Sequence, residues 1–222
     1  MTKIYFLLFF VLISVLAIAQ VRNSPFNFKA DTAGATGFLF AGDSSKPVFN
    51  VEYNRILDSA YSLNNEYEFQ FRLWKRHLSS SFDDVFVLTL KDKKWTARYF
   101  NLRISGKNTS QFSERPVKQL YVNQLWEMLL KNNLLSLPDQ SVLEDKMVSY
   151  EIDTANLQYP TIKSLDVMDG TLYCFELLSP DGKRYYSYGN PLRYLKEYSN
   201  IRELYNAALI VMLIEKFLEQ SL

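Results

Sequence analysis

Cysteine and histidine are almost absent from this sequence of 222 residues, which contains one of each, Cys174 and His77. A single cysteine cannot form an intramolecular disulfide, and one residue of each kind cannot supply the ligands of a structural zinc site. Cysteine–histidine catalysis would also need an exposed thiol, whereas Cys174 lies between Tyr173 and Phe175 in a pattern typical of a buried cysteine. We therefore expect no disulfide framework, no metal site and no catalytic cysteine.

Glycine is also scarce, with seven residues, none of which stands in a Gly-x-Gly-x-x-Gly or Walker arrangement. Such loops bring backbone N–H groups close to phosphates, so their absence gives no reason to expect a nucleotide or another cofactor. The Gly-x-Ser-x-Gly motif of serine hydrolases is missing too, and His77 follows Lys75 and Arg76 with no carboxylate beside it. The acidic residues between Glu151 and Asp169 lack the spacing of a calcium-binding loop.

Neither sign of charge prevails, since 25 basic residues stand against 24 acidic ones. A chain with so little net charge has no strong field for nucleic acid or for an anionic membrane surface. We therefore expect no nucleic-acid partner. A protein or carbohydrate ligand, if there is one, would be recognised through local contacts.

The longest apolar run begins the chain, where Ile4 to Ile18 follows a short positive start. Small residues at Ala17 and Ala19 end this run as a signal-peptidase site requires, so we predict a secretory signal over 1–19 that is cleaved after Ala19. The alternative is an uncleaved anchor, but the run is shorter than the ~20 residues of a membrane-spanning helix. We expect an exported bacterial protein, periplasmic or extracellular, with no stable membrane span after cleavage.

The rest of the chain predicts one folded domain. Residues 20–47 mix small polar residues with short phenylalanine patches and show no sustained period, which indicates a loosely ordered N-terminal arm. Residues 48–222 are enough for a single domain with its own core. Its predicted elements are a helix from Asn50 to Asn64, strands over 67–74, 84–90, 95–100 and 147–152, a hairpin over 171–189, and helices over 117–132 and 195–219.

Tight turns between these strands predict a mainly antiparallel sheet, which would pack against the two main helices in an α+β fold. The order strand, turn, strand, helix occurs over 84–132 and again over 171–219. A weak ββα internal repeat therefore remains open.

The hairpin over Thr171–Pro191 carries the candidate binding residues. With Pro180 and Asp181 at the centre of its turn and Gly182 as a bulge, Ser179 would face Lys183. This register would place Tyr173, Phe175, Leu177 and Tyr185 on a core face. It would place a mixed polar and aromatic set on the other face, and with Trp95 from a nearby strand the predicted binding residues are Glu176, Arg184, Tyr186, Tyr188 and Trp95.

Without a recognisable catalytic constellation, the sequence favours a non-catalytic envelope or accessory protein that binds a ligand or protein partner through a sheet face or helix groove. One alternative is a carboxylate-dependent hydrolase acting on polysaccharide or cell wall. Glu176 would then be buried with a raised pKa, although strand alternation favours an outward position for it. The carboxylates that could meet across a sheet are Glu66, Glu68, Asp83, Asp84 and Glu176.

A second alternative is a structural or assembly subunit that self-associates, for example as a homodimer. The uninterrupted apolar run Ala207–Ile214 would form the interface. Such a run is also typical of a helix buried nearly all round in the core of a monomer, which is the interpretation we favour.

Overall fold

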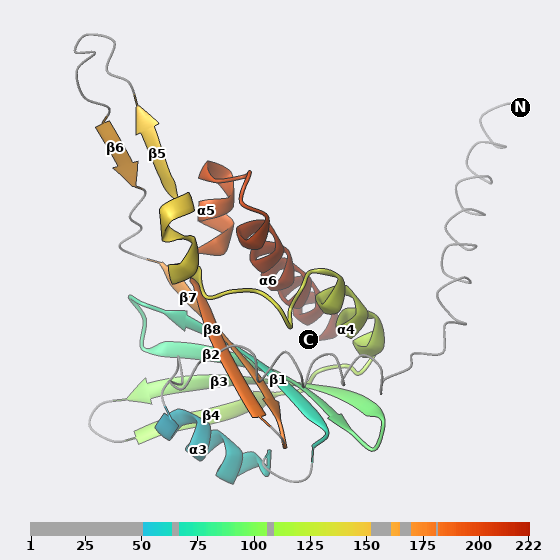
Figure 1. The fold of residues 1–222 in the computed structure, drawn as a ribbon. Coiled ribbons are helices and arrows are strands. Elements are labelled where there is room, and N and C mark those ends of the chain that lie inside the picture. The colour runs from blue at the N-terminus through green and yellow to red at the C-terminus, as the bar shows by residue number, and fades with distance from the viewer. Residues whose placement is uncertain (1–50, 64–66, 106–108, 152–160, 165–169, 181) are drawn as a thin grey trace, which may run out of the picture. The chain divides into compact units, whose positions relative to one another are not determined.

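The computed structural model describes residues 51–63, 67–105, 109–151, 161–164, 170–180 and 182–222 (Figure 1). These residues all belong to one compact unit. The predicted signal peptide and N-terminal arm lie outside the described residues, so both stay predictions. Within the described ranges, no helix combines the length and the apolar character needed to cross a membrane.

A six-stranded antiparallel sheet organises the fold, in the order β4-β3-β2-β1-β7-β8. The strand β1 is flanked by the hairpin of β2 and β3 on one side and by that of β7 and β8 on the other (Figure 1). A separate pair, β5 and β6, forms a two-stranded sheet. The bounds are β1 Phe69–His77, β2 Phe82–Lys91, β3 Lys94–Ser105, β4 Thr109–Arg115, β5 Val148–Glu151, β6 Thr161–Ser164, β7 Thr171–Ser179 and β8 Gly182–Gly189.

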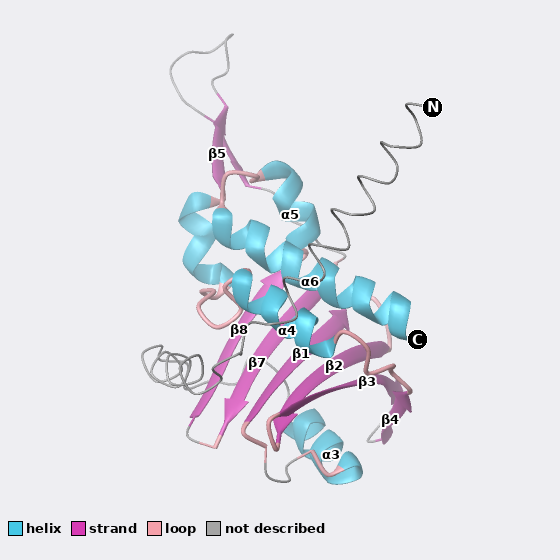
Figure 2. Ribbon diagram, turned by 90° about the vertical axis from the view of Figure 1, so that its right-hand side faces the viewer, coloured by secondary structure: helices cyan, strands magenta, loops and turns pink. Residues whose placement is uncertain are grey.

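Helices lie on both faces of the large sheet. On one face α3 packs through Leu57 onto a cluster that includes Trp74, Phe100 and Cys174. The opposite face is covered by α4 and α6, which run across it in Figure 2 and contribute Trp126 to Phe69 and Phe217 to Phe86. The helices are α3 Val51–Tyr61, α4 Val122–Lys131, α5 Pro191–Glu197, α6 Arg202–Ser221 and the 3₁₀ helix η2 Gln140–Lys146. The predicted α+β fold is therefore confirmed.

The central position of β1 changes the meaning of its alternating sequence. Alternation of apolar and polar residues is typical of a strand with one buried face, but both faces of β1 are buried from Phe69 to Trp74. Phe71 and Leu73 face α4 and α6, whereas Gln70 and Arg72 are buried on the α3 side. Polar side chains such as Gln70 and Arg72 are normally expected on a solvent-exposed face, so the sequence pattern does not reveal their burial.

Two predicted helix boundaries are wrong. The helix predicted over 117–132 begins only at Val122, as α4, and the strand β4 before it continues to Arg115. Between them, the Gln119 amide accepts a hydrogen bond from the Ala97 N–H and donates one to the Ala97 carbonyl, both at 2.8 Å. The Gln119 side chain thus takes the place of a neighbouring strand residue in hydrogen bonding to the backbone of β3.

The predicted C-terminal helix over 195–219 is two helices, α5 and α6, separated by residues 198–201. Pro191 begins α5, where its missing N–H leaves no helical hydrogen bond unmade. The order hairpin then helix does occur on both sides of β1. The two copies of this order differ, because β4 extends the first hairpin and α5 precedes the main helix of the second.

The register predicted for the 171–189 hairpin is also wrong, by one residue. Ser179 pairs with Gly182, which takes part in the ladder instead of bulging. The Ser179 Oγ accepts the Gly182 N–H at 3.1 Å. Because successive side chains of a strand point to opposite faces, this shift moves Tyr186 and Tyr188 to the face that carries Phe175.

The outer edge of β8 is bonded by side chains of the segment that enters η2. Asp139 Oδ2 accepts the Ser187 N–H at 2.7 Å, and Gln140 Oε1 accepts the Gly189 N–H at 2.8 Å. The outward N–H groups of these two β8 residues are therefore satisfied without another strand.

Candidate functional site

The five residues predicted to bind a ligand are all buried, and they do not share a face. Glu176, with none of its surface exposed, faces α3. The other four lie on the α4 and α6 side, where 9% of Arg184, 7% of Trp95, 1% of Tyr186 and none of Tyr188 is exposed. The predicted common face is therefore wrong. A binding role for these residues stays a prediction, without the exposed surface on which it depended.

Three of them instead hold the irregular segment that follows α4. The hydroxyl of Tyr186 donates to the Leu134 carbonyl at 2.5 Å, and that of Tyr188 donates to the Pro138 carbonyl at 2.8 Å. Arg184 donates to the carbonyl oxygens of Leu135 and Leu137. These polar groups thus satisfy backbone acceptors of residues 134–138, a role that the sequence pattern did not reveal.

The fifth residue, Trp95, is part of the aromatic core beneath α4. Its ring centroid lies 4.3 Å from that of Trp126 and 6.2 Å from that of Phe69. On the same side of the sheet, Tyr173, Phe175 and Leu177 are buried as predicted for the core face. Tyr185, predicted to join them, lies on the α3 side because of the register shift and is half-buried.

On the α3 side, Glu176 forms a polar cluster with the helix and with β1. Its carboxylate accepts the Trp74 indole N–H at 2.9 Å and the Asn54 amide at 2.7 Å. Burial raises the pKa of Glu176, and the hydrogen bond from Trp74 and the charge of Arg72 oppose the rise. The outward position favoured from strand alternation is therefore wrong.

Arg72 is the second charged member of this cluster, with 1% of its surface exposed. Its guanidinium donates to Gln70 Oε1 at 2.6 Å, to Asn54 Oδ1 at 2.6 Å and to the carboxylate of Asp58. Asn54 and Asp58 are four residues apart and so lie on one face of α3. The helix is thereby joined to the central strand through polar contacts as well as through its apolar face.

A pocket of about 380 Å³ opens over this cluster between α3 and the sheet. Tyr67 and Tyr185 line it together with the exposed side chains of Arg55 and Lys183. Burial raises the pKa of Tyr185 to about 12 and also raises the pKa of Tyr67, so both hydroxyls are protonated at neutral pH. The full lining is Val51, Asn54, Arg55, Asp58, Tyr67, Arg72, Glu176, Leu178, Lys183 and Tyr185.

This pocket combines buried charged groups with a concave surface, and the two together are typical of functional sites. Burying charged groups costs free energy unless they are paired, and an apolar cluster of similar volume is often as stable. Ionisable groups with shifted pKa values that gather in a concave site are therefore candidates for function. Of the residues that form this site, the sequence pattern singled out only Glu176. Asn54, Asp58 and Arg72 were missed because polar residues on a helix or a strand are expected to be solvent-exposed.

Among the described residues, the carboxylates considered for hydrolysis do not gather in one place. Asp83 and Asp84 point to opposite faces of β2, Glu68 accepts the Lys93 N–H at the β2–β3 turn, and Glu66 lies outside the described residues. Glu176 is accompanied instead by Asp58 from α3.

Cys174 is buried, as its sequence context predicted. Burial raises the pKa of its thiol to about 12. In the part of the chain that the structure describes, no group of three or more His, Cys, Asp or Glu side chains is placed to hold a metal ion.

A scan against protein-family models, a search of curated proteins and a search of solved structures each found no match to this chain.

Proposed function

We propose that this protein is an exported, non-catalytic binding protein that holds a small carbohydrate in the pocket between α3 and the sheet. The observation that carries this proposal is the cluster of the buried Arg72 and Glu176 with the half-buried Asn54, whose polar groups face a pocket lined by two tyrosines. A sugar presents hydroxyl groups to polar side chains and C–H surface to aromatic rings, and this lining offers both.

The cluster is fixed before any ligand arrives. Arg72 is held by acceptors from β1 and α3, and Glu176 is held by donors from the same two elements. A lining with such fixed side chains loses little conformational entropy on binding. Because Arg55, Arg72 and Lys183 outnumber Asp58 and Glu176, the pocket suits a sugar that is neutral or carries one acidic group.

Isothermal titration calorimetry with a panel of neutral and uronic-acid mono- and disaccharides tests this proposal. We expect saturable heat with at least one sugar and an affinity about tenfold lower in Tyr185→Ala, because the variant loses an aromatic wall. The matched control is Tyr205→Ala, which removes a tyrosine that is 46% exposed on α6 and outside this pocket. No saturable heat with any sugar, or equal affinity in Tyr185→Ala and the unaltered protein, would contradict the proposal.

A hydrolase is the second candidate, because Asp58 and Glu176 both line the pocket and burial raises the pKa of Glu176. Binding ranks above it for a structural reason. Asp58 is engaged by Arg72, and both oxygens of Glu176 already accept hydrogen bonds from the protein. Release of reducing ends from a polysaccharide panel, abolished in both Asp58→Asn and Glu176→Gln, would reverse this ranking.

A further inference from the structure

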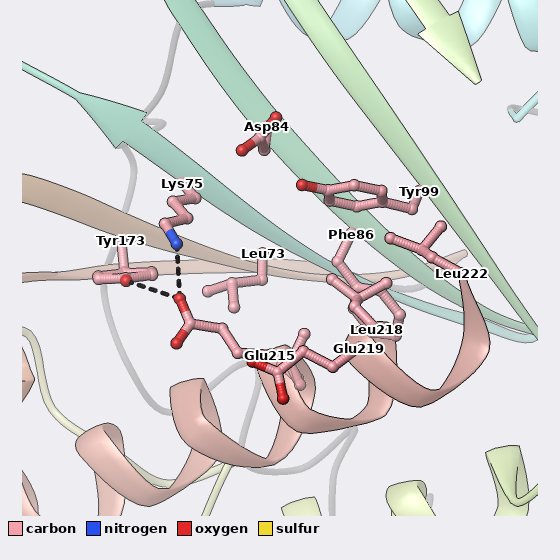
Figure 3. A pocket seen from close by; sticks show the side chains of 11 residues that line it. Leu73, Lys75, Asp84, Phe86, Tyr99, Tyr173, Glu215, Leu218, Glu219 and Leu222 are labelled. Carbon is pink, nitrogen blue, oxygen red and sulfur yellow. Dashed lines mark hydrogen bonds and ion pairs between the residues drawn. The ribbon is translucent and has the colours of Figure 1, made fainter. Parts of the chain in front are cut away.

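A second pocket lies on the opposite face of the sheet, between the C-terminal half of α6 and the strands β3, β2, β1 and β7 (Figure 3). Its volume is about 350 Å³. Its floor is apolar and buried, made by Leu73, Phe86 and Ile214, which are 4%, 2% and 1% exposed. This floor is suited to an apolar side chain.

Three of the four charged side chains that line this pocket are acidic. Lys75 is paired with Glu215 at 2.6 Å, and the Tyr173 hydroxyl donates to the same carboxylate at 3.2 Å (Figure 3). Asp84 and Glu219 also line the pocket. The one lysine of the lining is therefore matched by Glu215, and two further carboxylates remain.

The surroundings of Asp84 are well defined. Its carboxylate accepts a hydrogen bond from the amide of Asn101, and Tyr99 lines the same pocket. His77 Nε2 lies 3.8 Å from its carboxylate and carries a charge only when protonated. Burial and the neighbouring Asp84 raise the pKa of Tyr99 to about 12, so its hydroxyl remains a donor at neutral pH.

Asp84 and Tyr99 also line a neighbouring hollow of about 440 Å³, which extends over β3 and β4. This hollow is basic, because its lining includes Arg103 and Arg115. Arg103 lies over the ring of Phe82, and within the described part of the chain neither guanidinium forms an ion pair. Two hollows of opposite charge therefore meet at Asp84 and Tyr99.

We propose that these joined hollows bind a short apolar peptide with free termini, its ammonium group at Asp84, one side chain on the Leu73 and Phe86 floor, and its carboxylate at Arg115. The complementarity of charge and the apolar floor carry this assignment. The site is on the face opposite the carbohydrate pocket and shares no residue with it. It does not rest on the proposed function.

The test is calorimetry at pH 7 with the dipeptide Leu-Leu and three analogues: N-acetyl-Leu-Leu, Leu-Leu-amide and Gly-Gly. We expect saturable binding of Leu-Leu and an affinity about tenfold lower for each analogue, because each lacks one of the three recognised groups. Equal affinities for Leu-Leu and both blocked peptides, or no saturable heat with Leu-Leu at millimolar concentration, would overturn the proposal.

Variants locate the binding. Asp84→Asn is expected to abolish the preference for a free N-terminus, and Arg115→Gln the preference for a free C-terminus. Arg115 is exposed, so its variant has no buried contact to lose and keeps the test valid if Asp84→Asn unfolds. The control is Arg193→Gln, which removes an exposed arginine of α5, and an equal loss of Leu-Leu affinity in this control would contradict the assignment.

Discussion

Some charged residues of this protein are buried, and Arg72 is the clearest example. It is 1% exposed and has three protein acceptors. Removing one partner of a buried ion pair leaves the other charge without compensation, which costs more than the pair contributes.

We therefore expect Arg72→Met to lower the free energy of unfolding by about 3 kcal/mol, measured by urea denaturation. The control is Arg98→Met, because Arg98 pairs with Glu114 where both side chains are about one-third exposed. An exposed pair of this kind contributes about 0.5 kcal/mol. Similar losses of unfolding free energy in the two variants would contradict the expectation that removing Arg72 leaves an uncompensated buried charge.

Glu176 gives stability a pH dependence of definite sign. Burial raises its pKa above the ordinary 4.5 of glutamate, so the folded protein binds this proton more tightly than the unfolded chain does. The resulting stability is fully present below pH 4.5 and is lost as the pH rises through the folded-state pKa. In Glu176→Gln this loss should be absent, as measured by chemical denaturation across a pH series.

Glu114 provides a control of opposite sign. The hydrogen bond from Arg98 lowers its pKa, so its contribution is present above pH 4.5 and is lost as the pH falls through the lowered value. Glu114→Gln should therefore flatten the acid side of the curve. A Glu176→Gln curve parallel to that of the unaltered protein would refute the assignment to Glu176.

At the scale of elements, the parts that could be predicted are those with an apolar signal. The strands β1, β2 and β3 and the hairpin over 171–189 show it as alternation or as apolar runs. β4 was missed because Thr109–Arg115 has a single apolar residue, Phe112, and an edge strand has no partner on one side. The break between α5 and α6 was missed because residues 198–201 contain no glycine or proline.

The candidate site could be predicted only in part, for a related reason. Glu176 was singled out from its apolar neighbours, but its partners Arg72, Asn54 and Asp58 come from elements whose polar faces are normally wet. The hairpin register depended on whether Gly182 bulged or paired, and the turn sequence permits both. A one-residue choice thus decided the face of every β8 side chain.

The entry into β7 offers a test of local packing. A Cβ added at Gly170 would lie 2.0 Å from the side chain of Asn190, whose Oδ1 accepts the Thr171 N–H at 2.7 Å. We expect Gly170→Ala to cost about 1–3 kcal/mol in unfolding free energy. Gly189→Ala is the control, because a Cβ there meets no atom within 4 Å. Equal effects of the two substitutions would contradict this account.

At the scale of the whole molecule, the apolar run of α6 is largely used within its own chain. Ala207, Ala208, Ile210, Val211 and Ile214 are all buried. Self-association through this run stays a prediction, but its buried residues are not accessible to a second copy of the chain.

Sedimentation of the purified protein is therefore expected to give the mass of a monomer, unchanged in Met212→Glu. Met212 is 49% exposed on α6 and is the residue of the run that a partner would reach first. A dimer that Met212→Glu dissociates would instead establish the assembly subunit.

The bonds that Asp139 and Gln140 make to β8 have a consequence for crowded solutions. An edge strand with open N–H groups is a template onto which an unfolded neighbour adds a strand, and repetition of this step leads to fibrils. Here the template is already occupied at Ser187 and Gly189 by side chains of the same molecule. Asp139 and Gln140 thus oppose intermolecular strand addition at this edge, because they accept the two N–H groups that an added strand would need as donors.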